Sequence, residues 1–419
     1  MNKKIKVLVL ADSPFSPSGV GMQTRYMIES LMETGRYKFV CLAGAIRHQS
    51  YEPIVTEQYG EDWVVYPVDD YGNENIVRSM LWKEKPDIVW IMTDPRFWTW
   101  LWAMENEIRS VASLVYYHVW DNYPYPTFNK TYYDSNDAVV TISKVTDDIV
   151  RNVSPDVDVT RLPHAVPHDV FKKTKITDDG VLLLKKSLEK NNKMLFLWNN
   201  RNARRKQSGT LIFWFKEFLD IVGRKNAALL MHTEPKDPNG QDLEAILSEL
   251  GLVNGEVMIS TSKTNTEKLA QLYNAADCTI NISDAEGFGL ATLESLSCET
   301  PIIVNMTGGL QEQVTDGKEW FGIGIEPSAK AVIGSQTVPW IYEDRICKKD
   351  FIDSMVRFYN MSKEDREKMG RMGREHVLKN YSYKKYGNSW DKILTNIYEK
   401  NGSWNSRKNY QSWTFGEVV

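Results

Sequence analysis

Two glutamates with seven residues between them, Glu286 and Glu294, are the side chains whose type and spacing best suit chemistry. The apolar run 278–283 predicts a buried strand, and leucines at helical spacing after the Gly-Phe-Gly segment 287–289 predict a helix facing a core. Glycines let a ligand approach the backbone, and a helix N-terminus attracts anions. Eight helical residues rise by at most ~12 Å, so both carboxylates can hold one ligand. Alternatively, both glutamates merely favour the helix dipole.

A basic loop, residues 200–206, follows a second apolar run, residues 194–198. Arg201 offers a planar fork for bidentate binding, and Lys206 offers a point charge. Fixed cations of this kind stabilise a leaving group that gains negative charge as a bond breaks. The loop therefore predicts an anion site, whereas Arg204 and Arg205 are expected to be solvated surface charges.

Further motifs surround these two sites along the chain. They are Ala275-Ala276-Asp277, Cys298-Glu299-Thr300-Pro301, Gly308-Gly309, Asp316-Gly317, Leu230-Met231-His232-Thr233 and Leu162-Pro163-His164-Ala165-Val166. Together with the basic loop and the two glutamates, this run resembles the retaining glycosyltransferases of family four, the GT-B group with an E-x7-E motif. Most members of that family carry Gly where this chain has Glu299. The resemblance covers nearly the whole chain.

The resemblance implies a retaining transfer of a sugar from a nucleotide-diphosphate sugar to an acceptor hydroxyl, without a metal ion or another cofactor. It assigns the sugar hydroxyls to Glu286, the ribose to Glu294 and the diphosphate to Arg201 and Lys206. His118 would contact the transferred sugar, and a donor phosphate oxygen would take the acceptor proton. The backbone contacts to the donor would come from Gly19, Gly21, Gly287, Phe288, Gly289 and Leu290.

The acceptor is left open by the sequence: a carbohydrate, a lipid-linked molecule or a hydroxylated or hydroxymethylated base in DNA. The high aromatic content permits the DNA alternative, because aromatic side chains stack on flipped bases. A catalytically inactive GT-B binding module is a third hypothesis, against which the intact charged residues argue.

Several candidates have structural alternatives. Gly19 and Gly21 suit any tight strand-to-helix turn, and a lone His118 at a strand end is more often structural than functional. Trp120 and Asp121 can line the acceptor side or simply pack. We interpret His164, His168 and Asp156-Val157-Asp158 as structural or surface residues rather than catalytic or metal-binding ones. The basic segment 365–379 is expected to be a solvated helix face, with a nucleic-acid contact as the alternative.

The chain has 419 residues, a net charge of −4 and a pI near 6.0, so no overall positive field draws it to nucleic acid. Four widely spaced cysteines favour a reducing compartment, and we expect a cytoplasmic protein. The apolar start, residues 7–11, ends at Asp12 and predicts a buried strand rather than a signal peptide. The aromatic stretch 90–104 is interrupted by charges and too short to span a bilayer.

Apolar strands alternate with amphipathic helices along the chain, which predicts α/β layers with parallel sheets. The expected architecture is GT-B: two Rossmann-like domains with parallel sheets facing a cleft, and a C-terminal helix packing back across it. The predicted parts are an acceptor-side domain at 1–170, an irregular linker at 171–192, a donor domain at 193–380, and a crossing helix with tail at 381–419. Residues 324–342 resemble a loop-rich insertion, and residues 407–419 a mobile tail.

Overall fold

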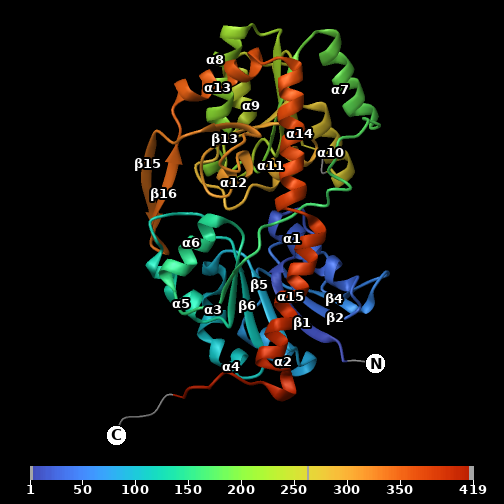
Figure 1. Ribbon diagram of the computed structural model, residues 1–419, viewed down its shortest axis with the longest axis vertical. Helices are drawn as coiled ribbons and strands as arrows, with labels where there is room; N and C mark the ends of the chain where they lie inside the picture. Colours follow the sequence, from blue (N-terminus) through green and yellow to red (C-terminus); the bar gives the residue numbers. More distant parts are fainter. Residues whose placement is uncertain (1–2, 262–263, 415–419) are drawn as a thin grey trace. The chain divides into compact units, whose positions relative to one another are not determined.

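The computed structural model describes residues 3–261 and 264–414, which divide into two compact units. Unit 1 comprises Met1–His164, Gly334–Trp340 and Tyr383–Val419, and unit 2 comprises Ala165–Ile333 and Ile341–Ser382. Each unit has its own sheet with helices on it (Figure 1). The first unit closes at His164, before the predicted boundary at residue 170.

An eight-stranded sheet in the order β3-β4-β2-β1-β5-β6-β7-β8 forms the centre of unit 1. All neighbouring strands are parallel except β3 and β4. The strands are β1 Ile5–Asp12, β2 Tyr37–Gly44, β3 Ile54–Thr56, β4 Gly60–Pro67, β5 Ile88–Met92, β6 Ser113–His118, β7 Ala138–Thr141 and β8 Val159–Arg161. The predicted strand at the chain start is β1, and its near-continuous apolar sequence suits a strand buried on both faces.

Helices cover both faces of this sheet. They are α1 Gly19–Met32, α2 Glu74–Glu84, α3 Thr99–Ala103, α4 Glu105–Arg109, α5 Lys130–Asp134, α6 Lys144–Val153 and α15 Tyr383–Asn401, with short 3-10 turns at Pro95–Trp98, Thr127–Asn129 and Trp404–Ser406. On one face, α2 and the segment 98–108 pack against Leu8, Val89 and other strand residues.

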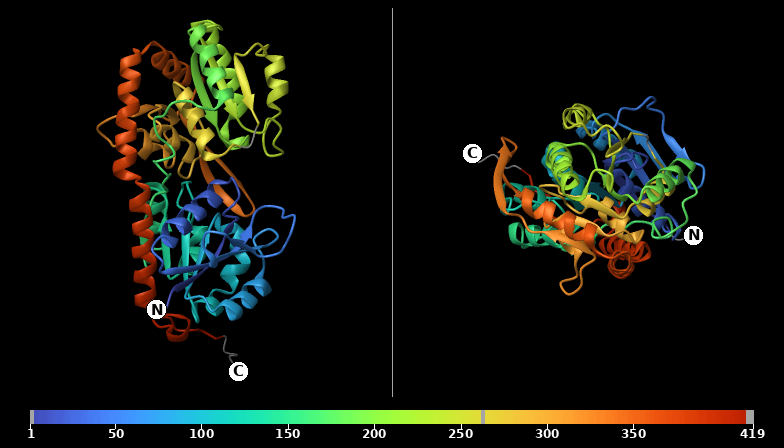
Figure 2. Two further views of the ribbon diagram at one scale, coloured as in Figure 1. Left: turned by 90° about the vertical axis from the view of Figure 1, so that its right-hand side faces the viewer. Right: turned by 90° about the horizontal axis from the view of Figure 1, so that it is seen from above.

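The C-terminal helix α15 belongs to unit 1 and lies along α1, as Figures 1 and 2 show. Its Tyr386 hydroxyl donates to the Gln23 carbonyl at 3.3 Å, and Trp390 packs edge-on against Trp90 and Tyr117. The chain therefore returns to its first unit at the C-terminus, as predicted.

The segment after α15 is anchored, which corrects the prediction of a mobile tail for its described part, up to residue 414. Arg407 is 5% exposed and bonds to the Asp137 carboxylate at 2.8 Å. The Trp413 amide donates to Asn106 Oδ1 at 3.1 Å. Polar composition suggested mobility, but buried charge pairing holds these residues in place. The predicted tail's last residues, 415–419, lie outside the described residues.

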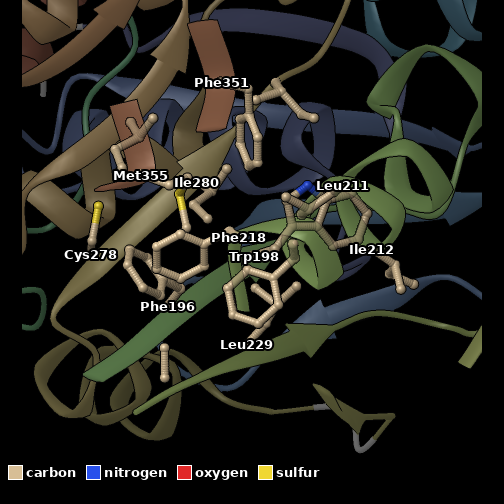
Figure 3. Packing of buried hydrophobic residues seen from close by; sticks show 14 of the residues in the cluster. Phe196, Trp198, Leu211, Ile212, Phe218, Leu229, Cys278, Ile280, Phe351 and Met355 are labelled. Carbon is tan, nitrogen blue, oxygen red and sulfur yellow. The ribbon is translucent and has the colours of Figure 1, made fainter. Parts of the chain in front are cut away.

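Unit 2 is built on a six-stranded parallel sheet in the order β11-β10-β9-β12-β13-β14. The strands are β9 Met194–Asn199, β10 Ala227–His232, β11 Val257–Ser260, β12 Cys278–Asn281, β13 Ile302–Asn305 and β14 Gly322–Ile325. One face carries an aromatic core in which Phe196 packs edge-on against Phe218, and Trp198, Ile280 and Phe351 belong to the same cluster (Figure 3).

The helices of unit 2 alternate with its strands. They are α7 Asp179–Lys190, α8 Ser208–Val222, α9 Leu243–Glu249, α10 Thr266–Ala275, α11 Leu290–Ser297, α12 Leu310–Val314, α13 Lys348–Asn360 and α14 Lys363–Asn380, with a 3-10 turn, η3, at Arg204–Lys206. The predicted irregular linker contains α7, because Asp178 caps an amphipathic stretch that buries Val181 and Leu188. The predicted solvated helix, α14, also binds the chain: Arg374 donates to the Phe171 carbonyl at 3.1 Å.

The predicted loop-rich insertion is mostly strand. It contains the end of β14 and a two-stranded hairpin, β15 Ala329–Ser335 and β16 Val338–Arg345. The hairpin tip, Gly334–Trp340, groups with unit 1, where Trp340 packs edge-on against Phe128 at 5.1 Å between ring centroids. Its alternating, half-exposed residues gave little hydrophobic signal.

The backbone conformation of Glu299 accounts for the glycine that the family pattern has at this position. Its backbone φ is +63°, in the left-handed region that glycine adopts without strain. A glycine at this position in relatives therefore fits the backbone, and this chain tolerates a side chain there. Among residues 3–261 and 264–414, no helix is long and apolar enough to cross a membrane.

Candidate functional site

Lys206 and Glu286 form a direct ion pair at the carboxyl edge of the unit 2 sheet. Their side chains are 9% and 13% exposed, so water screens the pair weakly. Asn281 Nδ2 also donates to Glu286 Oε2 at 3.3 Å. Burial alone would raise the pKa of Glu286, but the charges of Lys206 and Arg205 outweigh it and hold that pKa below its ordinary value. Glu286 is therefore an anion at neutral pH.

The two residues meet because β9 and β12 are neighbours in a parallel sheet, whose carboxyl ends share one edge. The loops that follow these strands are bonded to each other. The Asp284 amide donates to the Arg205 carbonyl at 2.8 Å, and the Arg205 guanidinium donates to the Ala285 carbonyl. Arg205 is exposed, as predicted for a surface charge, and its guanidinium also joins the two loops.

The glycine pair after β13 packs directly on the Glu286 loop. A Cβ on Gly308 would lie 1.9 Å from the Glu286 carbonyl oxygen, so only glycine fits there. The Gly309 amide donates to the same oxygen at 3.0 Å. The motif Gly308-Gly309, noted in the sequence, therefore shapes the loop that carries Glu286.

The turn between Glu286 and α11 presents backbone donors. Within the described parts of the chain, the amide groups of Gly287, Gly289 and Leu290 donate no hydrogen bond. Phe288 is buried against Tyr381, and its carbonyl accepts from Gln313 Nε2 at 2.7 Å. This arrangement leaves N–H groups at the start of an eight-residue helix available for an anionic or hydroxyl-bearing ligand.

Glu294 lies on α11 in a different environment from Glu286. Its Oε2 accepts from the Tyr273 hydroxyl at 2.7 Å, and Tyr273 in turn accepts from Asn199 Nδ2 at 2.8 Å. Burial raises the pKa of Glu294 to about 7, because the tyrosine hydroxyl only partly offsets desolvation. The two glutamates therefore differ in charge near neutral pH, a difference that their spacing does not reveal.

Arg201 is oriented toward Asp237 and not toward Glu286. Its guanidinium makes a two-pronged pair with that carboxylate, at 2.6 and 3.1 Å, and the side chain is 63% exposed. Arg204 is 60% exposed, as predicted for a solvated charge, and pairs with Glu343, whose side chain is 2% exposed. The basic loop is thus held by acidic partners from distant parts of the chain, and Lys206 is its member that faces Glu286.

Asp284 is a site residue to which sequence reasoning gave no role. Its Oδ2 accepts from Gln207 Nε2 at 2.6 Å and lies 3.0 Å from Arg345 Nε. Burial raises the pKa of Asp284 to about 6, against the opposing effects of Gln207 and Arg345. Arg345 also bonds to Glu343 at 2.6 Å, so these residues link the hairpin end to both strand-end loops. A carboxylate two residues before Glu286 was the available signal.

His118 ends β6 in unit 1 and is fully buried. Its Nε2 is hydrogen-bonded to the Tyr133 hydroxyl at 2.9 Å, whereas its Nδ1 has no hydrogen-bond partner in the described structure. Burial lowers the pKa of His118 to about 3, so the imidazole is neutral at physiological pH. Such a ring can donate or accept a hydrogen bond but is a poor proton acceptor.

The segment of unit 1 that contains Gly19 and Gly21 is tightly packed. A Cβ on Gly21 would lie 2.3 Å from Ser16 Oγ and 2.5 Å from the Ser13 carbonyl oxygen, which gives this glycine a structural role. Gly19 is exposed at the first turn of α1, whose N-cap is Ser18. Ser18 also donates to the Asp12 carboxylate at 2.5 Å.

Two further candidates of unit 1 are buried and hydrogen-bonded within the chain. Trp120 is buried and donates from Nε1 to the Asn122 carbonyl at 2.9 Å. His164 is buried and bonded through Nδ1 to the Tyr117 hydroxyl at 2.8 Å, which agrees with its predicted structural role. Among the residues described, no three His, Cys, Asp or Glu side chains are grouped so as to hold a metal ion.

Part of this chain matches a known protein family. Residues 216–355 match the family described as "Glycosyl transferases group 1". A D-inositol 3-phosphate glycosyltransferase of Acidothermus cellulolyticus is 36% identical over 114 residues, which cover 27% of this chain and 23% of the relative. The corresponding enzyme of an Arthrobacter species is 28% identical over 109 residues, 26% of this chain and 25% of the relative. The chain thus spans about a quarter of the length of these curated relatives.

Solved structures match almost the whole chain. Sucrose-phosphate synthase from Thermosynechococcus elongatus superposes with a TM-score of 0.73 at 15% identity, over 95% of this chain and 100% of that one. Anabaena HepE in complex with UDP and glucose gives 0.68 at 13% identity, over 93% and 99%. At these identities the likeness shows the fold alone. Residues 216–355 therefore resemble the group 1 glycosyltransferases, and the chain as a whole has the GT-B fold.

Proposed function

We propose that this protein is a retaining glycosyltransferase that transfers a sugar from a nucleotide-diphosphate sugar to an acceptor hydroxyl without a metal ion. The observation that carries the proposal is the buried Lys206–Glu286 pair beside backbone N–H groups at the start of α11. The group 1 domain supports a nucleotide-sugar donor, as does the presence of UDP and glucose in the HepE complex.

The donor would bind to unit 2 through residues of opposite charge. Lys206, and Arg201 after release from Asp237, would neutralise the diphosphate. Glu286 would accept hydrogen bonds from the sugar hydroxyls, and Glu294 from the ribose. The N–H groups of Gly287, Phe288, Gly289 and Leu290 would complete the donor contacts. An ionised carboxylate is a pure acceptor, so Glu286 suits vicinal hydroxyls at neutral pH and Glu294 suits them in its ionised form.

In the transfer step, the bond between the anomeric carbon and the diphosphate oxygen breaks, and the leaving diphosphate takes the electron pair. The acceptor oxygen attacks the same face of the sugar, and its proton passes to a diphosphate oxygen. We assign no side-chain base, because the pKa of His118 is about 3 owing to burial. His118 would instead hold a sugar hydroxyl through a hydrogen bond from its neutral ring.

Unit 1 would bind the acceptor, with Gly19 and Gly21 near the diphosphate. Exposed aromatic side chains follow three of its adjacent strands: Phe15 after β1, Phe97 after β5 and Tyr125 after β6. Such rings pack on the apolar face of a sugar or on a base. We favour a carbohydrate, because a protein of net charge −4 does not attract a polyanion.

The same three aromatic rings also permit a DNA acceptor, because base stacking needs only a planar face. A gel shift with salt titration on hydroxymethylated DNA separates the two acceptors, because phosphate contacts make binding strongly salt-dependent. Salt-sensitive binding together with sugar transfer to the base would establish the DNA acceptor.

The deciding experiment incubates the purified protein with a panel of nucleotide sugars and carbohydrate or DNA acceptors. Mass spectrometry identifies the product, and NMR of the new glycosidic bond gives its anomeric configuration. We expect transfer from one nucleotide sugar with retention. Inversion would contradict the proposed mechanism, and binding of a nucleotide sugar without turnover would favour the inactive module.

A further inference from the structure

A cavity of about 170 Å³ lies in unit 2, outside the residues proposed to hold the donor. Its walls come from the beginning of α8 with the residue before it, the loop after β12 and the end of β16 with the residue that follows it. The side chains that line it are Gln207, Thr210, Trp214, Ile282, Asp284 and Arg345, with Ile346 beside them. It adjoins the donor loops, because Gln207 follows Lys206 and Asp284 precedes Glu286 by two positions.

The size of the cavity sets the size of its ligand. An engineered protein cavity of ~150 Å³ holds one benzene molecule. This cavity therefore has room for one six-membered ring and not for a nucleotide or a disaccharide. Trp214, Ile282 and Ile346 supply apolar wall, as in most small-molecule pockets.

The polar wall is incompletely satisfied. Asp284 is only 3% exposed, and both Gln207 and Arg345 approach its Oδ2. Arg345 Nε is buried and donates no hydrogen bond within the described structure, although it lies 3.0 Å from Asp284 Oδ2. A buried N–H group that is ion-paired but makes no hydrogen bond gains from an oxygen in better alignment, so this atom favours a ligand that brings one.

The charges around the cavity balance. The carboxylates of Asp284 and Glu343 are matched by the guanidinium groups of Arg345 and Arg204. An added anion or cation would leave one buried charge unpaired, which costs more than a neutral ligand does. An uncharged ring with several hydroxyl groups can donate to Asp284, accept from Arg345 and place its C–H face on Trp214.

We propose that this cavity binds a single neutral monosaccharide at a site separate from the donor sugar. Binding itself does not require the proposed transfer reaction, so the two proposals can fail independently. The chemistry on the walls is that of sugar recognition: an aromatic ring, a carboxylate, a guanidinium, an amide and a hydroxyl around a space for one ring.

The test is ligand-observed NMR titration of the full chain with glucose, galactose and N-acetylglucosamine, and with cytosine and inorganic phosphate as the contrasting probes. Thr210→Leu fills the cavity, and Phe213→Leu is the matched control, because Phe213 lies on the same helix, is 47% exposed and does not line the cavity. Glu286→Gln reports on a sugar bound in the donor site instead.

We expect at least one sugar to bind the parent, the Phe213→Leu and the Glu286→Gln proteins alike, and Thr210→Leu to weaken it ~10-fold or more. Thr210→Val, which removes the hydroxyl with little change of volume, should weaken it ~3-fold and serves if Thr210→Leu does not fold. Equal binding by both Thr210 variants, loss of the sugar with Glu286→Gln alone, saturation only by cytosine or phosphate, or no binding by any probe would each overturn the proposal. Turnover of nucleotide sugars, measured separately, reports on the proposed function.

Discussion

The carboxyl edges of the two sheets differ in the charge of the candidate residues at their strand ends. In unit 2, Lys206, Glu286, Asp284 and Arg345 form buried or half-buried charge pairs at the strand ends. In unit 1, the buried His118 is neutral and bonded to a tyrosine hydroxyl. Two similar α/β layers thus present a charged edge and an edge with a neutral histidine. A charged diphosphate suits the first edge and an uncharged hydroxyl acceptor the second.

Removing the cation tests the charged edge most severely. Lys206→Ala should lower turnover by ~100-fold or more, because a buried positive charge would no longer stabilise the leaving diphosphate. Steady-state kinetics with the preferred nucleotide sugar measure the loss. Lys216→Ala is the control, since Lys216 lies on α8 and pairs with the half-exposed Asp220. Undiminished turnover in Lys206→Ala would remove Lys206 from the site.

The two glutamates should separate transfer from nucleotide binding. Glu294→Gln should weaken the free nucleoside diphosphate by ~1.5–3 kcal/mol, because a charge-assisted hydrogen bond to the ribose is lost. Glu286→Gln should impair transfer while leaving that affinity nearly unchanged. Calorimetric titration of both variants, beside their melting curves, measures this. If both bind the nucleotide as the parent does and lose only ~0.3–1 kcal/mol of stability, the helix-dipole interpretation is correct.

The sequence predicted the Lys206–Glu286 pair of the charged edge but not the residues that pair with the neighbouring loop side chains. Lys206 and Glu286 could be named because the family resemblance singles them out, and both follow apolar strands whose loops meet where parallel strands are adjacent. Asp237, Glu343 and Arg345 could not, because their partners Arg201, Arg204 and Asp284 are distant in the chain and are chosen by tertiary packing. Strand and helix periodicity predicted α/β layers with parallel sheets, and the family resemblance predicted the GT-B arrangement. The hairpin β15–β16 carried too weak an alternation to be recognised.

The two edges should also respond oppositely to pH. Burial lowers the pKa of His118 from 6.5 to about 3, so the unfolded chain binds the proton more readily and stability is lost as pH falls below 6.5. Burial raises the pKa of Glu294 from 4.5 to about 7, so the native state retains the proton and stability is lost as pH rises from 4.5 to 7. Each slope is at most ~1.4 kcal/mol per pH unit.

Denaturant titrations from pH 4.5 to 7 measure these slopes in the parent and in two variants. His118→Asn should remove the destabilisation on acidification, and Glu294→Gln should remove the destabilisation on raising the pH. Subtracting the pH slope of each variant from that of the parent isolates the contribution of one group from those of the other titrating residues. Slopes of the same sign for the two differences would show that the electrostatic contrast between the edges is wrong.

The smallest expected effect is that of a chelator. The proposed donor contacts supply their own cations, Lys206 and Arg201, and backbone N–H groups at the start of α11 add to them, so the diphosphate needs no metal ion to neutralise it. Turnover should therefore stay within about twofold when EDTA is added in excess. The matched control adds magnesium or manganese after chelation and expects no gain. Complete loss with EDTA and recovery with either metal would mean that the charged edge is completed by a cation from solution, and Lys206 would then have to act on Glu286 rather than on the leaving group.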